Sequence, residues 1–316
     1  MRPLIVLVGP TAVGKTELTI RLASHFSAHI ISADSMQIYR GMDIGTAKPT
    51  LEERKGIPHY LIDIVEPDQT FTVVDYQEHY NKVKSGLDEE EVLPILTGGT
   101  GLYIRAVTQG FIFPDPPPDP ELRASLHREA ETAGKEAVYQ RLLEVDPVSA
   151  KKIHPNDLKR ILRALEVTLS TGKPFSQLQK ARRKVLPPNI IYTGLTRDRK
   201  ELYNRIDQRV EEMVKNGLLD EVSSLVRHGY GPELQSMQGL GYKELVPVIE
   251  GQSTLDGAIE LIKKRTRNYA KRQGTWFRRE PVENWFVLSE GKEEDCYKNI
   301  LLYLEGRIRQ VSNSIS

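Results

Sequence analysis

The sequence has a single cysteine, Cys296, among 316 residues. One cysteine can form neither an internal disulfide nor a cysteine-based metal cluster, so the sequence favours a reducing compartment. A long apolar run is also missing. The longest one near the start, Leu4–Gly9, has six residues and leads directly into proline, which is too short for a membrane helix and unlike a signal peptide. We therefore expect a cytoplasmic protein with no membrane partner.

The chain also lacks a marked net charge of either sign. Its formal charge is +1 at pH 7, so any surface that binds nucleic acid must be a local patch. Hydrophobic residues make up 39% and charged residues 28%, which is typical of an ordinary globular protein. The length suits one large domain or two modest ones.

Short apolar segments alternate with amphipathic ones along the first hundred residues. The predicted buried strands are Leu4–Gly9, His29–Asp34, His59–Val65, Leu93–Gly99 and, later in the chain, Ile190–Leu195. The predicted helices between them are Lys15–Phe26 and Val74–Glu91. This alternation predicts an α/β fold with a doubly wound, mostly parallel sheet of the P-loop NTPase type. Its ligands should lie beyond the carboxyl ends of the strands.

A proline-rich stretch, Phe113–Arg123, interrupts this pattern with five prolines in seven residues. A charged stretch with helical spacing follows, from about Pro120 to Lys184, before the strand at Ile190. We therefore expect a core domain of residues 1–114 and 188–316 and a helical insertion of residues 115–187. The last 30 or so residues carry no recognisable signature.

The stretch VGPTAVGKTE, residues 8–17, matches the pattern G-x-x-x-x-G-K-[ST] through Gly9, Gly14, Lys15 and Thr16. Glycines let the backbone N–H groups converge on phosphate oxygens, the lysine adds a positive charge, and the threonine hydroxyl is a Mg²⁺ ligand. The strand before this stretch and the helix after it are the context that the pattern requires. It indicates a phosphate-binding loop, but it does not say whose phosphate is bound.

Asp34 stands at the end of the second predicted strand, which in this fold lies beside the phosphate loop. A carboxylate next to bound phosphate is repelled unless it acts as a proton acceptor or a metal partner. The alternative is that Asp34 only caps a turn. The polar and apolar residues after it, Ser35, Met36 and Gln37, suit a flat base, although a solvated loop is the alternative. Asp63, near the end of another strand, is a possible acid on the metal side.

Two further stretches bear on the ligand. LTGGTGLY, Leu96–Tyr103, is a second glycine-rich turn from strand to helix, and Thr97 and Thr100 could face the same ligand. Lys263–Arg279 holds eight Lys or Arg residues and no acid, with Tyr269, Trp276 and Phe277 interleaved. Cations suit a phosphate backbone, and aromatic rings suit unpaired bases. The alternative is a solvated helix face with its aromatic residues packed inward.

Six stretches occur in an order that resembles one family. They are GPTAVGKTEL, ISADSMQIYRGMDIGTAKP, TGGTGLY, HPNDLKRILRALE, QGLGYKE and RNYAKRQGTWFR. Together they closely resemble the tRNA dimethylallyltransferases, also called tRNA isopentenyltransferases, and the resemblance runs from about residue 4 to 280. That family transfers a dimethylallyl group from dimethylallyl diphosphate to N6 of the adenosine immediately 3′ of a tRNA anticodon. The resemblance therefore implies that the phosphate loop holds the diphosphate of a prenyl donor.

The resemblance also implies roles for individual residues. Asp34 would be the general base, with Lys15 and Thr100 as its catalytic partners, and Thr16 would hold Mg²⁺. The residues expected to bind the diphosphate are Gly9, Thr11, Ala12, Val13, Gly14, Lys15, Thr16 and Arg209. The residues expected to contact tRNA are Asp34, Ser35, Met36, Gln37, Thr100, Arg123, Lys159, Arg160, Arg163, Gly241, Tyr242, Lys243, Lys271, Arg272, Gln273, Trp276 and Arg278. The insertion would clamp the tRNA, and we expect a monomer.

Two other functions fit parts of this sequence. An ATP-dependent kinase of a small molecule or nucleoside would use the same phosphate loop. An RNA-binding module with a vestigial nucleotide site would use the basic stretch without catalysis. The sequence does not indicate which tRNAs are chosen or the order in which the substrates bind.

Overall fold

The computed structural model describes residues 2–110, 119–180 and 186–315. The chain divides into two compact units, residues 1–108 with 186–316 and residues 109–185. The sequence prediction placed the insertion at residues 115–187, within a few residues of the second unit. Residues 113–118 of the predicted proline-rich link lie outside the described residues, whereas Pro120 opens the first helix of the second unit.

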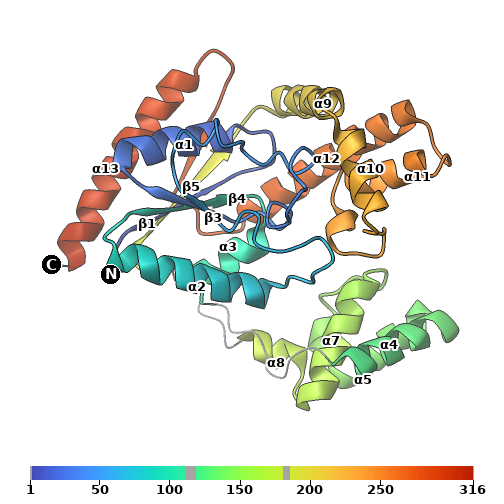
Figure 1. The fold of residues 1–316 in the computed structure, drawn as a ribbon. Helices are drawn as coiled ribbons and strands as arrows, with labels where there is room; N and C mark the ends of the chain where they lie inside the picture. Colours follow the sequence, from blue (N-terminus) through green and yellow to red (C-terminus); the bar gives the residue numbers. More distant parts are fainter. Residues whose placement is uncertain (1, 111–118, 181–185, 316) are drawn as a thin grey trace. The chain divides into compact units, whose positions relative to one another are not determined.

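The first unit is built on a six-stranded sheet in the order β3-β2-β4-β1-β5-β6, and each neighbouring pair is parallel (Figure 1). The strands are β1 (Leu4–Val8), β2 (His29–Ser32), β3 (His59–Tyr60), β4 (Pro94–Gly98), β5 (Ile190–Thr196) and β6 (Asn284–Val287). The helices of this unit are α1 (Lys15–Phe26), α2 (Val73–Glu89), α3 (Gly101–Thr108), α9 (Arg199–Lys215), α10 (Leu218–Arg227), α11 (Tyr242–Ile249), α12 (Leu255–Phe277) and α13 (Glu293–Ile315), with a 3₁₀ turn at Ser236–Gln238. The predicted doubly wound, parallel α/β fold is confirmed.

Alternate residues along the strands supply two apolar cores, one on each face of the sheet. Val6 and Val8 of β1 join the core that α2, α3, α10, α11 and α12 cover. Ile5 and Leu7 of the same strand join the core that α1, α9 and α13 cover. Figure 1 shows α1 and α13 on one face of the sheet and α2 on the other. Because β1 is buried on both faces, it reads as the continuous apolar run LIVLV.

Local signals set the helices next to the site. Helix α1 follows Gly14, whose φ of 107° is a left-handed conformation that favours glycine. Helix α2 begins after Thr72, which forms a reciprocal capping box with Asp75. In contrast, the predicted strand His59–Val65 ends after two residues, because Leu61 and Asp63 take positive φ angles of 62° and 56° that turn the chain out of the sheet.

The second unit is helical, as the spacing of the insertion predicts. Its helices are α4 (Pro120–Thr132), α5 (Lys135–Val145), α6 (Pro147–Ala150), α7 (Leu158–Thr171) and α8 (Phe175–Lys180). Helix α7 contributes Ile161, Leu162 and Leu165 to a small core of its own. Among the described residues, no helix is both long enough and apolar enough to cross a membrane.

The packing of β4 against the end of β2 leaves no room for a side chain at Gly98. A Cβ there would stand 2.2 Å from the carbonyl oxygen of Ala33. We expect Gly98→Ala to lower the free energy of unfolding by about 1–3 kcal/mol, because backbone must move. Gly86→Ala in α2, where a Cβ would meet nothing within 4 Å, is the control and should stabilise the helix by about 0.5–1 kcal/mol. Equal stability of the two variants in urea titrations would contradict this account.

Candidate active site

The predicted phosphate loop joins β1 to α1. Ala12 and Gly14 have φ angles of 61° and 107°, so the backbone turns through left-handed conformations at two points. Gly9 is required for a different reason, because a Cβ there would stand 2.7 Å from the carbonyl oxygen of Leu195 in β5. The two glycines of the motif therefore serve a close approach and a turn, respectively.

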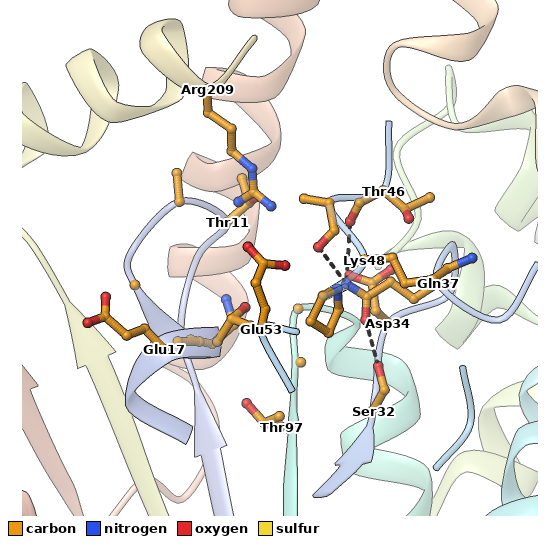
Figure 2. Close-up of a pocket in the computed structure, with 18 of the residues that line it drawn as sticks. Thr11, Glu17, Ser32, Asp34, Gln37, Thr46, Lys48, Glu53, Thr97 and Arg209 are labelled. Carbon is orange, nitrogen blue, oxygen red and sulfur yellow. Dashed lines mark hydrogen bonds between the residues drawn. The ribbon is translucent and has the colours of Figure 1, made fainter. Parts of the chain in front are cut away.

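A cavity of about 610 Å³ lies in front of this loop, and we call it the phosphate-loop cavity. Five predicted diphosphate-binding residues of the loop line it: Thr11, Ala12, Gly14, Lys15 and Thr16. Figure 2 shows Arg209 and Thr11 on one side and Asp34 with Gln37 on the other, with Glu53 between them in this view. Gly9 and Val13 lie behind the lining, since the Val13 side chain is fully buried in the core under α1.

Four cationic side chains line this cavity: Lys15, Lys48, Arg205 and Arg209. The Lys15 ammonium donates to the carbonyl oxygens of Gly9 and Pro10, at 2.9 and 2.8 Å. Burial, and secondarily the charge of Arg209, lowers the pKa of Lys15 to about 7, while Asp34 acts in the opposite direction. Burial also lowers the pKa of Arg209. Arg205, one helical turn before Arg209 in α9, donates from Nε to the carbonyl oxygen of Ala12.

Asp34 lies two residues beyond the end of β2, in the wall of this cavity. Its Oδ1 accepts a hydrogen bond from the Met36 N–H at 2.9 Å, so the carboxylate does cap a turn. Among the residues that the structure describes, no donor reaches its other oxygen, Oδ2. The turn cap and a role for Asp34 as proton acceptor are therefore compatible.

A second cavity, of about 320 Å³, adjoins the first. Seven of the residues predicted to contact tRNA line it: Asp34, Ser35, Met36, Gly241, Tyr242, Lys243 and Arg272. Both cavities include Thr11, Asp34, Thr46, Arg209, Met213 and Tyr269 in their walls. Asp34 therefore stands where the phosphate-loop cavity meets a second, more apolar cavity.

Three residues predicted to contact tRNA are engaged inside the first unit. Gln37 lines the phosphate-loop cavity, but its carboxamide donates to the carbonyl oxygens of Thr46 and Ala47 and accepts from the Ser32 hydroxyl. Thr100, which is not among the described lining residues, accepts from the Ser35 N–H at 2.9 Å and donates to the Ser35 hydroxyl.

Gln273 is the third of these residues. Its side chain is buried and bonded at both ends, to the Thr11 N–H and to the carbonyl oxygen of Gly99. Gln273 also lines the phosphate-loop cavity, and its contact with tRNA stays a prediction.

The remaining basic residues are at the surface or partly exposed. Lys271 and Arg278 are exposed at the end of α12. The half-buried Trp276 packs under the Arg105 guanidinium, with the Arg105 Cζ 4.3 Å from the centroid of the Trp276 ring. Aromatic residues of this stretch are thus packed inward, as the alternative interpretation expected, while several cations face solvent.

The second unit contains the other four residues predicted to contact tRNA. Lys159 and Arg160 are exposed on α7. Arg123 and Arg163 both pair with Glu166, whose side chain is only 3% exposed. That buried carboxylate holds the two guanidinium groups near one another. The side chains remain partly exposed, at 48% for Arg123 and 37% for Arg163.

The suggestion that Asp63 is an acid on the metal side stays a prediction, and the structure shows its carboxylate in another contact. Its carboxylate accepts from the buried Lys48 ammonium, which also bonds Asp43 and the carbonyl oxygen of Tyr39. Asp63 is not in the described lining of the phosphate-loop cavity. The positive φ of Asp63 turns it out of the strand that the sequence predicts.

Sequence reasoning missed two residues that shape the site. Glu221 of α10 accepts from the N–H groups of Asp43, Ile44 and Gly45 and from the Tyr242 hydroxyl. It thereby fixes the loop before Thr46, but nothing in its local sequence signals this. Arg205 was detectable, because it lies four residues before Arg209 on the same helix face.

Tyr269 appeared in the sequence interpretation only as an aromatic residue of the basic stretch. In the structure it lines both cavities, and burial raises the pKa of its hydroxyl to about 12. The hydroxyl therefore stays neutral and keeps its proton at physiological pH.

The residues present fit the expected Mg²⁺ ion in kind. Thr16 lines the phosphate-loop cavity together with the carboxylates of Glu17 and Glu53. Mg²⁺ prefers hard oxygen ligands and is held by one or two protein groups plus the phosphates of the substrate. No group of three or more His, Cys, Asp or Glu residues arranged for a metal occurs in the described parts of the chain. Such a preformed cluster is not needed when the substrate supplies most of the ligands.

The parallel sheet, the phosphate loop after β1 and the carboxylate after β2 define an α/β protein of the P-loop type, with a site suited to a phosphorylated ligand. Comparisons with known proteins narrow this class. The family model described as IPP transferase matches residues 37–280. The chain belongs to this family, which confirms the resemblance seen in the sequence.

Individual relatives agree. A tRNA dimethylallyltransferase of Thermoanaerobacter sp. (strain X514) is 48% identical over 96% of this chain and 98% of its own. The solved tRNA isopentenylpyrophosphate transferase of Bacillus halodurans is 40% identical, covers 99% of both chains and has a TM-score of 0.75. A eukaryotic dimethylallyltransferase, solved in a study of its action on tRNA, has a TM-score of 0.81 at 28% identity and covers 95% of this chain and 77% of its own.

The lowered pKa of Lys15 predicts how the affinity for a diphosphate depends on pH. Below pH 7 the amine is already charged, whereas above pH 7 a bound anion must draw a proton onto it. Affinity should therefore fall as the pH rises above 7, by up to about tenfold per pH unit. Titration calorimetry with inorganic diphosphate between pH 6 and 9 would measure this, including the uptake of a proton.

Lys15→Met is the control, because it leaves only the titration of the diphosphate itself. The pH dependence of Lys15→Met should be shallower than that of the wild type above pH 7. Parallel curves for the two proteins would show that Lys15 does not titrate on binding.

Proposed function

We propose that the chain transfers a dimethylallyl group from dimethylallyl diphosphate to N6 of the adenosine immediately 3′ of a tRNA anticodon. A C–N bond forms at N6, the C–O bond to diphosphate breaks, and the N6 proton passes to Asp34. The observation that carries this assignment is the position of Asp34 in the common wall of the two cavities. Family membership and the names of the relatives support the same reaction.

The phosphate-loop cavity is the proposed site of the prenyl donor. Backbone N–H groups of residues 11–16 and the side chains of Lys15, Arg205 and Arg209 would hold the diphosphate. Negative charge grows on this group as it leaves, and preorganised cations stabilise that charge without reorganisation. When Mg²⁺ is bound, on Thr16, it would supply further positive charge to the leaving diphosphate.

The second cavity is the proposed site of the adenine. The N6 amine is a poor nucleophile because its lone pair is delocalised into the ring, so attack requires removal of its proton. Asp34 Oδ2 would accept that proton while Oδ1 remains bonded to Met36. The base has to leave the anticodon-loop stack to enter a cavity of this kind. Ser35, Met36 and Tyr242 would then contact it.

The proposed tRNA surface consists of cations near the end of α12 and cations in the second unit. Lys271, Arg272 and Arg278 are exposed near the end of α12. Arg123, Lys159, Arg160 and Arg163 would contact the phosphate backbone from the second unit, which we propose as the clamp. We also propose that the enzyme is a monomer and acts in the cytoplasm, where its tRNA substrate is found.

Substitution of Asp34 tests the chemistry. Asp34→Asn keeps an oxygen for the Met36 N–H but removes the proton acceptor, so turnover should fall by roughly 10²–10⁴. The affinity for tRNA should change little. The measurement is incubation with unmodified tRNA and dimethylallyl diphosphate or ATP, followed by nucleoside analysis, with the exposed Asp68→Asn as control.

Each outcome of that incubation has a clear meaning. Prenylated adenosine in the wild type and Asp68→Asn, but not in Asp34→Asn, supports the proposal. Phosphate transfer from ATP would favour the kinase instead, and tRNA binding without any product would favour the binding module. Normal turnover in Asp34→Asn would remove the general-base role.

The cationic surface predicts a salt dependence. Lys271→Ala should weaken tRNA binding about equally for all sequences and reduce the slope of log K against log salt by about one. Filter binding at several salt concentrations measures this, with the exposed Lys298→Ala in α13 as control. An unchanged slope in Lys271→Ala would exclude this residue from the tRNA contact.

A further inference from the structure

Gln273 connects two loops that are far apart in sequence. Its Oε1 accepts from the Thr11 N–H of the phosphate loop at 2.8 Å, and its Nε2 donates to the Gly99 carbonyl oxygen at 2.9 Å. The side chain is only 5% exposed. Reversing the carboxamide would set a donor against the Thr11 N–H and an acceptor against the Gly99 carbonyl, so only one orientation satisfies both bonds.

The Gly99 end of this link continues to Asp34. Thr100 donates its N–H to the Ala33 carbonyl oxygen at 3.0 Å, and its hydroxyl accepts from the Ser35 N–H at 2.9 Å. The turn after β4 therefore holds the residues on both sides of Asp34. Hydrogen bonds joined by the Gly99–Thr100 peptide group therefore lead from Thr11, through Gln273, to the backbone that carries the carboxylate.

Close packing keeps this link short. A Cβ at Gly99 would stand 2.3 Å from Gln273 Nε2, so any larger residue there would displace the amide. Tyr269, one turn earlier on α12, lines both cavities, and Arg272 lines the second. Gln273 thus ties the phosphate loop to the helix that lines both cavities.

We propose that Gln273 is a positioning residue, which fixes the distance between the donor in the phosphate loop and the proton acceptor Asp34. This inference rests on the proposed function. In a displacement at carbon, the nucleophile, the reacting carbon and the leaving group must be aligned, and a misplacement of about 1 Å lowers the rate roughly a hundredfold. Loss of the link should therefore lower kcat and leave tRNA affinity nearly unchanged.

The test is the variant Gln273→Glu. An ionised glutamate side chain at this position would accept from the Thr11 N–H but repel the Gly99 carbonyl oxygen, whereas a protonated one would accept from the Thr11 N–H and donate to the Gly99 carbonyl oxygen. At pH 8 we expect kcat at least tenfold below wild type. The ratio of variant to wild-type kcat should rise as the pH falls towards 5.5, since protonation restores both bonds. Lys15 and Asp34 line the same cavity as Gln273, so the uncharged Gln273→Met variant gives the pH profile with which the ratio for Gln273→Glu is compared.

Two further variants control this experiment. Gln273→Met has a similar size but no amide, so its kcat should be low and its ratio to wild type independent of pH. The exposed Gln252→Glu carries the same change of charge and should behave as wild type. Fold is monitored by thermal unfolding, and if Gln273→Glu does not fold, the kcat of Gln273→Met decides.

The outcomes separate this inference from the proposed function. If the wild type prenylates tRNA and the ratio for Gln273→Glu is flat, or kcat of Gln273→Met is normal, the positioning role is wrong. A loss of tRNA affinity with normal kcat would instead assign Gln273 to the tRNA contact that the sequence predicts. If the wild type forms no product, the proposed function itself fails.

Discussion

Parallel pairing of three strands is the constraint on which the site depends. β4 pairs with β1 on one side and with β2 on the other, in registers that align Val8 with Gly98 and Ser32 with Thr97. Because all three strands run in the same direction, the segments that follow them emerge at one edge of the sheet. The phosphate loop, the turn that carries Asp34 and the second glycine-rich turn are brought together by backbone pairing before any side chain of the site is considered.

The cavity at that edge holds two cations, Lys15 and Arg209, whose burial disfavours their charged forms. Burial lowers the pKa of both Lys15 and Arg209, and Asp34 acts in the opposite direction on each. A bound diphosphate would take over as the main counter-charge of these two cations. Asp34 would then face a nearby anion, which makes a carboxylate a better proton acceptor. On the proposed function, binding of the donor and activation of the nucleophile would therefore be coupled through these charges.

Apolar runs and turn residues in the sequence predicted most strands of the sheet. They gave wrong or missing strands where the backbone conformation or a distant pairing partner decides the structure. The apolar run of β1 and the following glycines identified the phosphate loop, because strand, turn and helix are adjacent in sequence. The predicted third strand was too long, since positive φ angles at Leu61 and Asp63 cannot be read from an apolar run. β6 and α13 went unpredicted: β6 has four residues and forms only by pairing with β5.

The site divides in the same way. The positions of Lys15 and Asp34 in the cavity wall could be predicted from a motif and a strand end. The contacts of Glu221 could not, since its backbone partners lie 176 to 178 residues away. Gln273 was named only through the family resemblance, as a tRNA contact, and its partner Gly99 is 174 residues away. The absence of a side chain at Gly99 has its reason in that distant glutamine, which needs the space. The second glycine-rich turn and the basic stretch look independent in the sequence, but Gly99 and Gln273 form one contact between them. A substitution at either residue should therefore displace the other.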